Sequence, residues 1–112
     1  MSSIRQNKIS KLVQKALGEL FQRESISLFD GAFITVTLVR ISPDLSVAKT
    51  YISLYAVKDK ETILEKIKLQ HKEIRRRIGE KLRNQLRIIP ELQFFIDDSL
   101  DYAEKIENLL KK

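Results

Sequence analysis

The chain has no cysteine and no tryptophan, and a single histidine among its 112 residues. Without cysteine there is no disulfide framework, no thiol nucleophile and no cysteine-ligated metal. His71 has no second histidine to complete a metal site, so we expect no bound zinc. The three glycines, at positions 18, 31 and 79, are too far apart for a P-loop or a Rossmann dinucleotide motif.

Catalytic patterns are missing as well. No serine stands in a nucleophile elbow, and no serine–histidine–acid arrangement is evident. The sequence contains no signal-peptide core and no apolar run of membrane length. We therefore expect a non-enzymatic cytoplasmic protein with no catalytic residues, no cofactor, no metal and no membrane partner.

The length and composition predict one folded domain over residues 1–112. Hydrophobic residues make up 43% of the chain and charged residues 32%, which is typical of a globular protein. We expect this domain to be a monomer.

Charge is unevenly distributed along the chain. Residues 66–87 contain nine Lys or Arg and two acidic residues, whereas residues 91–107 contain six acidic residues and one lysine. The whole chain has a net charge of +6 and an isoelectric point near 9.7. A concentrated basic segment indicates a polyanion, and above all a nucleic acid, as the partner.

Helical spacing of apolar residues begins near the N-terminus. Ser2 or Ser3 is placed to cap a helix, which we expect to end near Ser25. The apolar residues recur at steps of three and four, which indicates one buried face: Ile9, Leu12, Val13, Ala16, Leu17 and Leu20.

Two strands are predicted on either side of a turn at residues 42–44. Residues 32–41 are rich in β-branched and aromatic side chains, and residues 47–55 follow the turn. In the second strand we expect the even positions to be buried and the odd positions to face outward. Strands so close in sequence most simply form an antiparallel hairpin.

Helical spacing returns over residues 61–87, with Ile74, Ile78 and Leu82 at steps of four. An unbroken helix of this length is unusual in a small domain, so we expect two helices or one kinked helix that ends before Pro90. A third strand over residues 92–97 and a final helix from Ser99 complete the chain. This order predicts an α+β fold with helices on one face of a three-stranded sheet.

The basic residues are the main candidate site. If residues 72–87 are helical, Lys72, Arg76, Arg83 and Arg87 lie on the side opposite the apolar stripe, where a phosphate backbone can approach. The alternative is an ordinary solvated helix face. The candidate RNA-binding residues are Lys8, Lys11, Lys15, Lys72, Arg75, Arg76, Arg77, Arg83 and Arg87.

Other groups have simpler explanations. Lys49, Tyr51 and Tyr55 form a possible base-stacking platform, although tyrosine is common in strands. The acidic residues Asp97, Asp98 and Asp101 fit helix capping better than a metal site.

One segment resembles a known family. Residues 85–100, Gln-Leu-Arg-Ile-Ile-Pro-Glu-Leu-Gln-Phe-Phe-Ile-Asp-Asp-Ser-Leu, are similar to part of the ribosome-binding factor A family. The hairpin also fits, with Asp44 and Leu45 followed by Ala48 and Tyr51, as does the basic N-terminal helix. The resemblance extends over roughly residues 4–110.

The resemblance implies a KH-type fold, similar to type II, in the order α-β-β-α-(kink)-α-β-α. It implies a bacterial factor that binds the immature 30S subunit and its 16S rRNA, assists late maturation and supports growth in the cold. Other assembly factors are then further candidate partners. The alternative is a generic KH-like module for single-stranded RNA with no tie to ribosomes.

The resemblance also raises the question of how the central helices are joined. No Gly-x-x-Gly loop is present. The family's Ala-x-Gly kink corresponds to Lys72-Glu73-Ile74, which has neither residue. The kink is therefore expected either at residues 72–74 or near Gly79.

Overall fold

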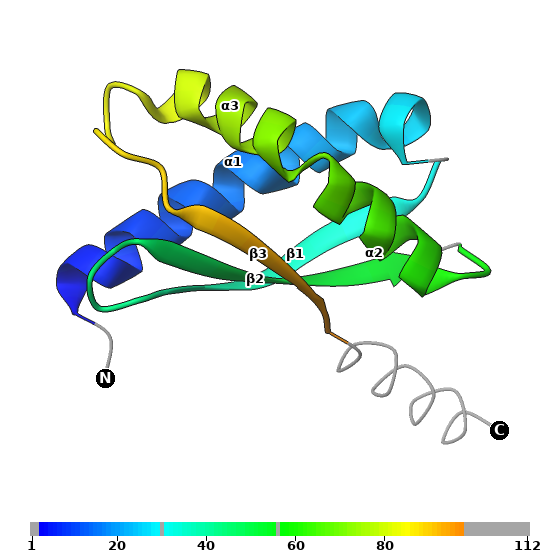
Figure 1. Cartoon of the computed structure of the whole chain (residues 1–112), viewed down its shortest axis with the longest axis horizontal. Coiled ribbons are helices and arrows are strands. Elements are labelled where there is room, and N and C mark those ends of the chain that lie inside the picture. The colour runs from blue at the N-terminus through cyan, green and yellow to red at the C-terminus, as the bar shows by residue number, and fades with distance from the viewer. Residues whose placement is uncertain (1–2, 30, 56, 98–112) are drawn as a thin grey trace, which may run out of the picture.

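The structure is a computed structural model that describes residues 3–29, 31–55 and 57–97, with the side chains of residues 25–28 left out of the description. Its elements are α1 (Ile4–Leu28), β1 (Phe33–Ile41), β2 (Val47–Tyr55), α2 (Lys60–Leu69), α3 (His71–Leu82) and β3 (Glu91–Ile96), shown in Figure 1. The helix expected from Ser99 lies outside the described residues. The described elements confirm the α+β fold.

A reciprocal cap begins α1. The Ser3 hydroxyl accepts a hydrogen bond from the Gln6 N–H, and the Gln6 side-chain oxygen accepts one from the Ser3 N–H. This capping box satisfies two donors that the first turn leaves without helical partners. The helix continues to Leu28, three residues beyond the end expected near Ser25.

The same helix protects the free edge of the sheet. Side chains at four-residue intervals on α1 donate to carbonyl groups of β1: Gln6 to Ile41, Ser10 to Val39 and Gln14 to Val36. An open strand edge is a template for pairing with another chain. The polar residues on this face of α1 therefore satisfy carbonyl groups that would otherwise be open to a second chain.

Gln6→Ala is expected to lower the free energy of unfolding by about 2 kcal/mol, because it removes half of the capping box and leaves the Ile41 carbonyl without this donor. Gln6 is 9% exposed, and its amide lies 2.8 Å from that carbonyl. Urea denaturation followed by circular dichroism measures the change. The neighbouring exposed Asn7→Ala is the control, and an equal loss in both variants would contradict this role.

The sheet has the order β1-β2-β3, with β1 antiparallel and β3 parallel to β2. The even positions of β2 are buried, as expected from the sequence. The expectation for the odd positions was wrong at Ser53, which is only 1% exposed. The Asp97 carboxylate accepts a hydrogen bond from Thr37 on β1, so this contact spans the central strand β2.

One face of the sheet forms the core, and none of the described helices covers the other. Leu17, Ile52 and Phe94 are among the buried residues that the helices and the sheet contribute to the core. On the outer face Phe33 is 65% exposed, and Phe95 stacks on Tyr51 with ring centroids 5.4 Å apart. The helices thus cover one face, as predicted.

The break between the central helices lies at Gln70. The Asp59 side chain caps the start of α2, and the Gln70 N–H bonds back to the last turn of that helix before α3 begins at His71. Both expected positions were therefore wrong, because residues 72–74 and Gly79 all lie inside α3 and the break falls two residues before Lys72. A Cβ at Gly79 would lie 3.4 Å from the Ile89 side chain, which is an ordinary van der Waals contact, so the following loop packs on this part of α3.

The helical expectation for residues 83–87 was also wrong. Helix α3 ends at Leu82, and a turn follows in which the Leu86 N–H still bonds to the Leu82 carbonyl. Leu86 and Ile89 pack against the core, which requires the chain to leave the helix axis. Among the described residues, no helix is both long enough and apolar enough to cross a bilayer.

Candidate nucleic-acid interface

Helices α1 and α3 lie side by side and are joined by ion pairs. Arg77 of α3 binds Glu24 of α1 at 2.8 Å. Lys81, one turn later on α3, pairs with Glu19, which lies nearer the N-terminus of α1. Because Lys8, Lys11 and Lys15 are on α1, this packing brings the two basic segments of the sequence onto neighbouring helices.

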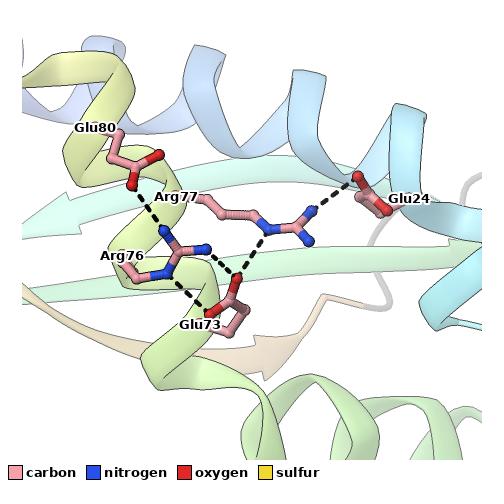
Figure 2. Close-up of polar contacts among 5 residues, drawn as sticks. All are labelled: Glu24, Glu73, Arg76, Arg77 and Glu80. Carbon is pink, nitrogen blue, oxygen red and sulfur yellow. Dashed lines mark hydrogen bonds and ion pairs between the residues drawn. The ribbon is translucent and has the colours of Figure 1, made fainter.

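Three consecutive arginines, Arg75, Arg76 and Arg77, which we call the arginine triplet, mostly bind other groups of the protein. Figure 2 shows Arg76 bound to Glu73 and Glu80, and Arg77 bound to Glu73 and Glu24. Arg76 keeps 56% of its side chain exposed, whereas Arg77 keeps 36%. These contacts neutralise part of the charge that the sequence places here, so Arg76 and Arg77 contribute less to a field for polyanions than their number suggests.

The hydrogen bond from Arg76, followed by that from Arg77, lowers the pKa of Glu73 from 4.5 to about 2. A carboxylate with a lower pKa in the folded state stabilises the fold above its unfolded pKa and loses that effect as it is protonated. The contribution of Glu73 is therefore complete above pH 4.5 and declines as the pH falls toward about 2.

Glu73→Gln is accordingly expected to weaken the dependence of stability on pH below 4.5. Urea unfolding at a series of pH values should show a smaller loss of stability for this variant than for the wild type. The control is Glu65→Gln, an exposed residue of α2 with no ion pair in the described part of the chain. An unchanged pH profile in Glu73→Gln would contradict the role of the cluster.

Arg75 holds the loop that follows α3. Its guanidinium donates to the Ile89 carbonyl at 2.5 Å through Nη2 and at 3.1 Å through Nε, with a longer contact to the Pro90 carbonyl. These bonds fasten the loop to α3 just before β3 begins. Arg75 thus positions the segment that bears Arg87.

The remaining candidates have no ion pair with any residue that the structure describes, and all six are exposed: Lys8, Lys11, Lys15, Lys72, Arg83 and Arg87. We call these residues the unpaired cations. Arg83 and Arg87 follow α3 in the turn and loop, so they approach a ligand from loop positions. Because the unpaired cations form no ion pair with a described acid, they are the residues best suited to bind phosphate.

A groove of about 670 Å³ joins α3 to the loop before β3, and we call it the basic groove. It is lined by His71, Lys72, Arg75, Arg76, Arg87, Ile88, Ile89 and Glu91. Four of these side chains are cationic, and Glu91 is the acid. His71 Nδ1 lies 2.9 Å from the Lys68 carbonyl. The groove brings Lys72 and Arg87 together although they are far apart in sequence.

The two secondary candidates are described to different extents: Tyr51 of the stacking platform stacks on Phe95, whereas only one of the three acidic residues is described. No cluster of three or more possible metal ligands occurs within the described residues. Asp97 is bound to Thr37, while Asp98 and Asp101 lie outside the described residues.

Two residues near the candidate surfaces were given no role from the sequence. They are Arg5, which lies near Lys8, and Phe95, which stacks on Tyr51. The alternation of β3 was the signal that placed Phe94 inward and Phe95 outward.

Comparison with known proteins gives a consistent result. The family model described as ribosome-binding factor A matches residues 5–110. A ribosome-binding factor A from Cytophaga hutchinsonii is 47% identical over 112 residues, covering 100% of this chain and 84% of that protein. Another from Flavobacterium johnsoniae is 40% identical over 111 residues, covering 98% of this chain and 85% of that protein.

Solved structures agree on the fold. The crystal structure of ribosome-binding factor A from Thermus thermophilus has a TM-score of 0.68 at 21% identity, covering 81% of this chain and 94% of that one. A Thermus thermophilus homology model fitted into the cryo-EM map of a 30S complex has a TM-score of 0.62 at 26% identity, covering 78% and 89%. The KH-like arrangement and the family match over residues 5–110 together show that the chain belongs to the ribosome-binding factor A family.

Proposed function

We propose that this protein is a non-enzymatic factor that binds the immature 30S subunit through its 16S rRNA and assists late maturation, including during growth in the cold. Membership of the family supports this function, as does the 30S complex into which the Thermus thermophilus model was fitted. The observation that carries the RNA contact is the set of unpaired cations on α1, α3 and the following loop.

The mechanism is binding without chemistry. The unpaired cations neutralise phosphates, and the ion pairs from Arg77 to Glu24 and from Lys81 to Glu19 hold α3 against α1. Phosphate contacts carry little base information, so selectivity comes from the shape of the immature particle. The protein acts as a monomer in the cytoplasm, and other assembly factors are candidate partners at surfaces not occupied by RNA.

The experiment is co-sedimentation of the purified protein with immature and mature small subunits on gradients at several salt concentrations. If six cations each neutralise one phosphate, log K against log salt is expected to have a slope of about −4 to −5. Binding should favour the immature particle. A flat salt response or equal binding to both particles would contradict the proposal.

A second candidate is a generic module for single-stranded RNA. It is favoured by the outer face of the sheet, which no described helix covers and on which Tyr51 and the partly exposed Phe95 form a stacked pair. Such a module would bind short free oligonucleotides as tightly as the particle. An assembly factor should bind them much more weakly.

A further inference from the structure

A second groove lies beside the basic groove and differs from it in chemistry. It has a volume of about 900 Å³ and is bounded by the N-terminal half of α1, the turn between β1 and β2, and the loop after α3. We call it the apolar cleft, and its apolar lining consists of Ile9, Leu12, Leu45, Leu86, Ile88 and Pro90. This size and lining are typical of a cleft that buries part of a ligand.

Charge at the rim of the apolar cleft is mainly positive. Arg5, Lys8 and Arg87 line it, and none of them has an ion pair with another described residue. The one acid, Asp44, accepts hydrogen bonds from the Ser42 and Ser46 hydroxyls, which lower its pKa to about 2. Asp44 therefore already has partners, whereas the three cations are available. The cleft fits a ligand with an apolar part and negative charge beside it.

Leu45 occupies an unusual conformation at this site. Its φ of 66° is in the left-handed region, which residues with a branched side chain rarely adopt. The turn is held by the Leu45 N–H, which donates to the Ser42 carbonyl, and by the Ser46 N–H, which donates to the Asp44 carboxylate. The turn thus places an aliphatic side chain in the wall of the cleft, at a backbone position that glycine would adopt without strain.

The two grooves adjoin each other. Arg87 and Ile88 line both, so the loop after α3 forms the ridge between them. A chain of phosphates that follows Lys72 in the basic groove would meet Arg87 at this ridge. The next nucleotide would then lie over the apolar cleft, with Arg5 and Lys8 on its far side.

We propose that the apolar cleft binds one unpaired nucleotide of the RNA, with its base on the aliphatic lining and its flanking phosphates on Arg5, Lys8 and Arg87. Apolar side chains commonly hold bases that have left a stack. Continuity with the basic groove favours RNA over an acidic peptide. The inference rests on the proposed function and adds selectivity for an unpaired nucleotide.

The test compares two RNA hairpins of the same length by fluorescence anisotropy, one fully paired and one with a single bulged adenosine. The wild type is expected to bind the bulged hairpin roughly 10-fold more tightly, since burial of one base against aliphatic side chains contributes on this scale. Leu45→Gly removes this side chain from the cleft wall, and the relief of backbone strain offsets the loss of its packing against the core. The variant should therefore remain folded in thermal unfolding and bind both hairpins equally.

Two further variants distinguish the phosphate contacts from the contact with the unpaired base. Lys8→Ala should weaken binding of both hairpins, because it removes a phosphate contact. Leu69→Ala is the matched control, because Leu69 is an exposed leucine on α2, 81% accessible and outside both grooves. It should retain the full preference for the bulged hairpin.

Equal, salt-sensitive binding of both hairpins by the wild type would overturn the cleft assignment and leave the proposed function intact. A preference that persists in Leu45→Gly would overturn it as well. Salt-insensitive or absent binding to both hairpins and to the subunit would overturn the proposed function together with the inference. Tighter binding of a Glu- and Leu-containing hexapeptide than of the bulged hairpin, lost in Leu45→Gly, would assign the cleft to a protein instead.

Discussion

Replacing Lys72, Arg83 and Arg87 together with alanine is expected to lower affinity for the immature small subunit by about 100-fold, because three phosphate contacts of about 1 kcal/mol each are removed. None of the three has an ion pair within the described chain. The variant should therefore keep the wild-type unfolding transition. Its log K against log salt should also have a slope smaller by about 2 to 3, because fewer counterions are released.

The control removes the same charge from another face. Arg40, Lys49 and Lys58 are exposed and have no ion pair with a described residue, and the first two lie opposite each other on β1 and β2. Replacing all three with alanine should reduce binding only modestly, through net charge. If both triple variants lose affinity equally, binding depends on overall charge and the basic surface proposed above is incorrect.

Replacement of the arginine triplet is a less specific test of RNA binding, because these side chains also hold the fold together. Arg75 fastens the loop, and Arg77 joins α3 to α1. Replacement of residues 75–77 with alanine would change binding and stability together, so it cannot isolate a phosphate contact. The unpaired cations separate the two effects.

Phe21→Ala is expected to have the largest effect on stability, a loss of about 3–5 kcal/mol. Phe21 is completely buried and makes edge-to-face contacts with Phe29 and Phe94, with ring centroids 5.6 Å and 6.3 Å apart. The substitution leaves a cavity where α1, the turn after it and β3 meet. Since small domains are stable by only about 5–15 kcal/mol, this variant should be close to unfolding at 37 °C.

Urea denaturation measures the loss, with Phe33→Ala as the matched control. Phe33 lies on the outer face of β1 and is 65% exposed, so its replacement should change the free energy of unfolding by no more than about 1 kcal/mol. A similar loss in both variants would show that Phe21 is not the centre of the core. The m-value of Phe21→Ala should remain that of the wild type if the fold is retained.

Most of the secondary structure could be predicted because it depends on local patterns. The limits of β2 were predicted correctly from alternation and the preceding turn, and β3 was predicted within one residue. The end of α3 was predicted too late, because the apolar spacing of four residues continues from Leu82 to Leu86 after the helix has ended. The turn there also keeps a helix-like hydrogen bond from the Leu86 N–H to the Leu82 carbonyl. The break at Gln70 has no glycine or proline to mark it.

The candidate site was predicted only as a charged segment. Counting basic residues identified residues 66–87, but the count could not show that Arg76 and Arg77 are paired with acids while Lys72 has no ion pair with a described residue. Glu73 and Glu80 are close enough in sequence to suggest helical ion pairs. Glu24 is distant, and only the packing of α1 against α3 brings it to Arg77.

The sequence alone determined the charge, the lack of thiol and nucleotide-binding motifs, and the order of the elements, since each depends on composition or on neighbours within a few residues. The tertiary structure alone decided which cations are available, that Gln6, Ser10 and Gln14 protect the edge of β1, and that Arg5, Lys8 and Arg87 surround one cleft. The reason is physical: the strength of a charge or polar group depends on what lies within a few ångströms of it, and in this protein those neighbours come from distant parts of the chain.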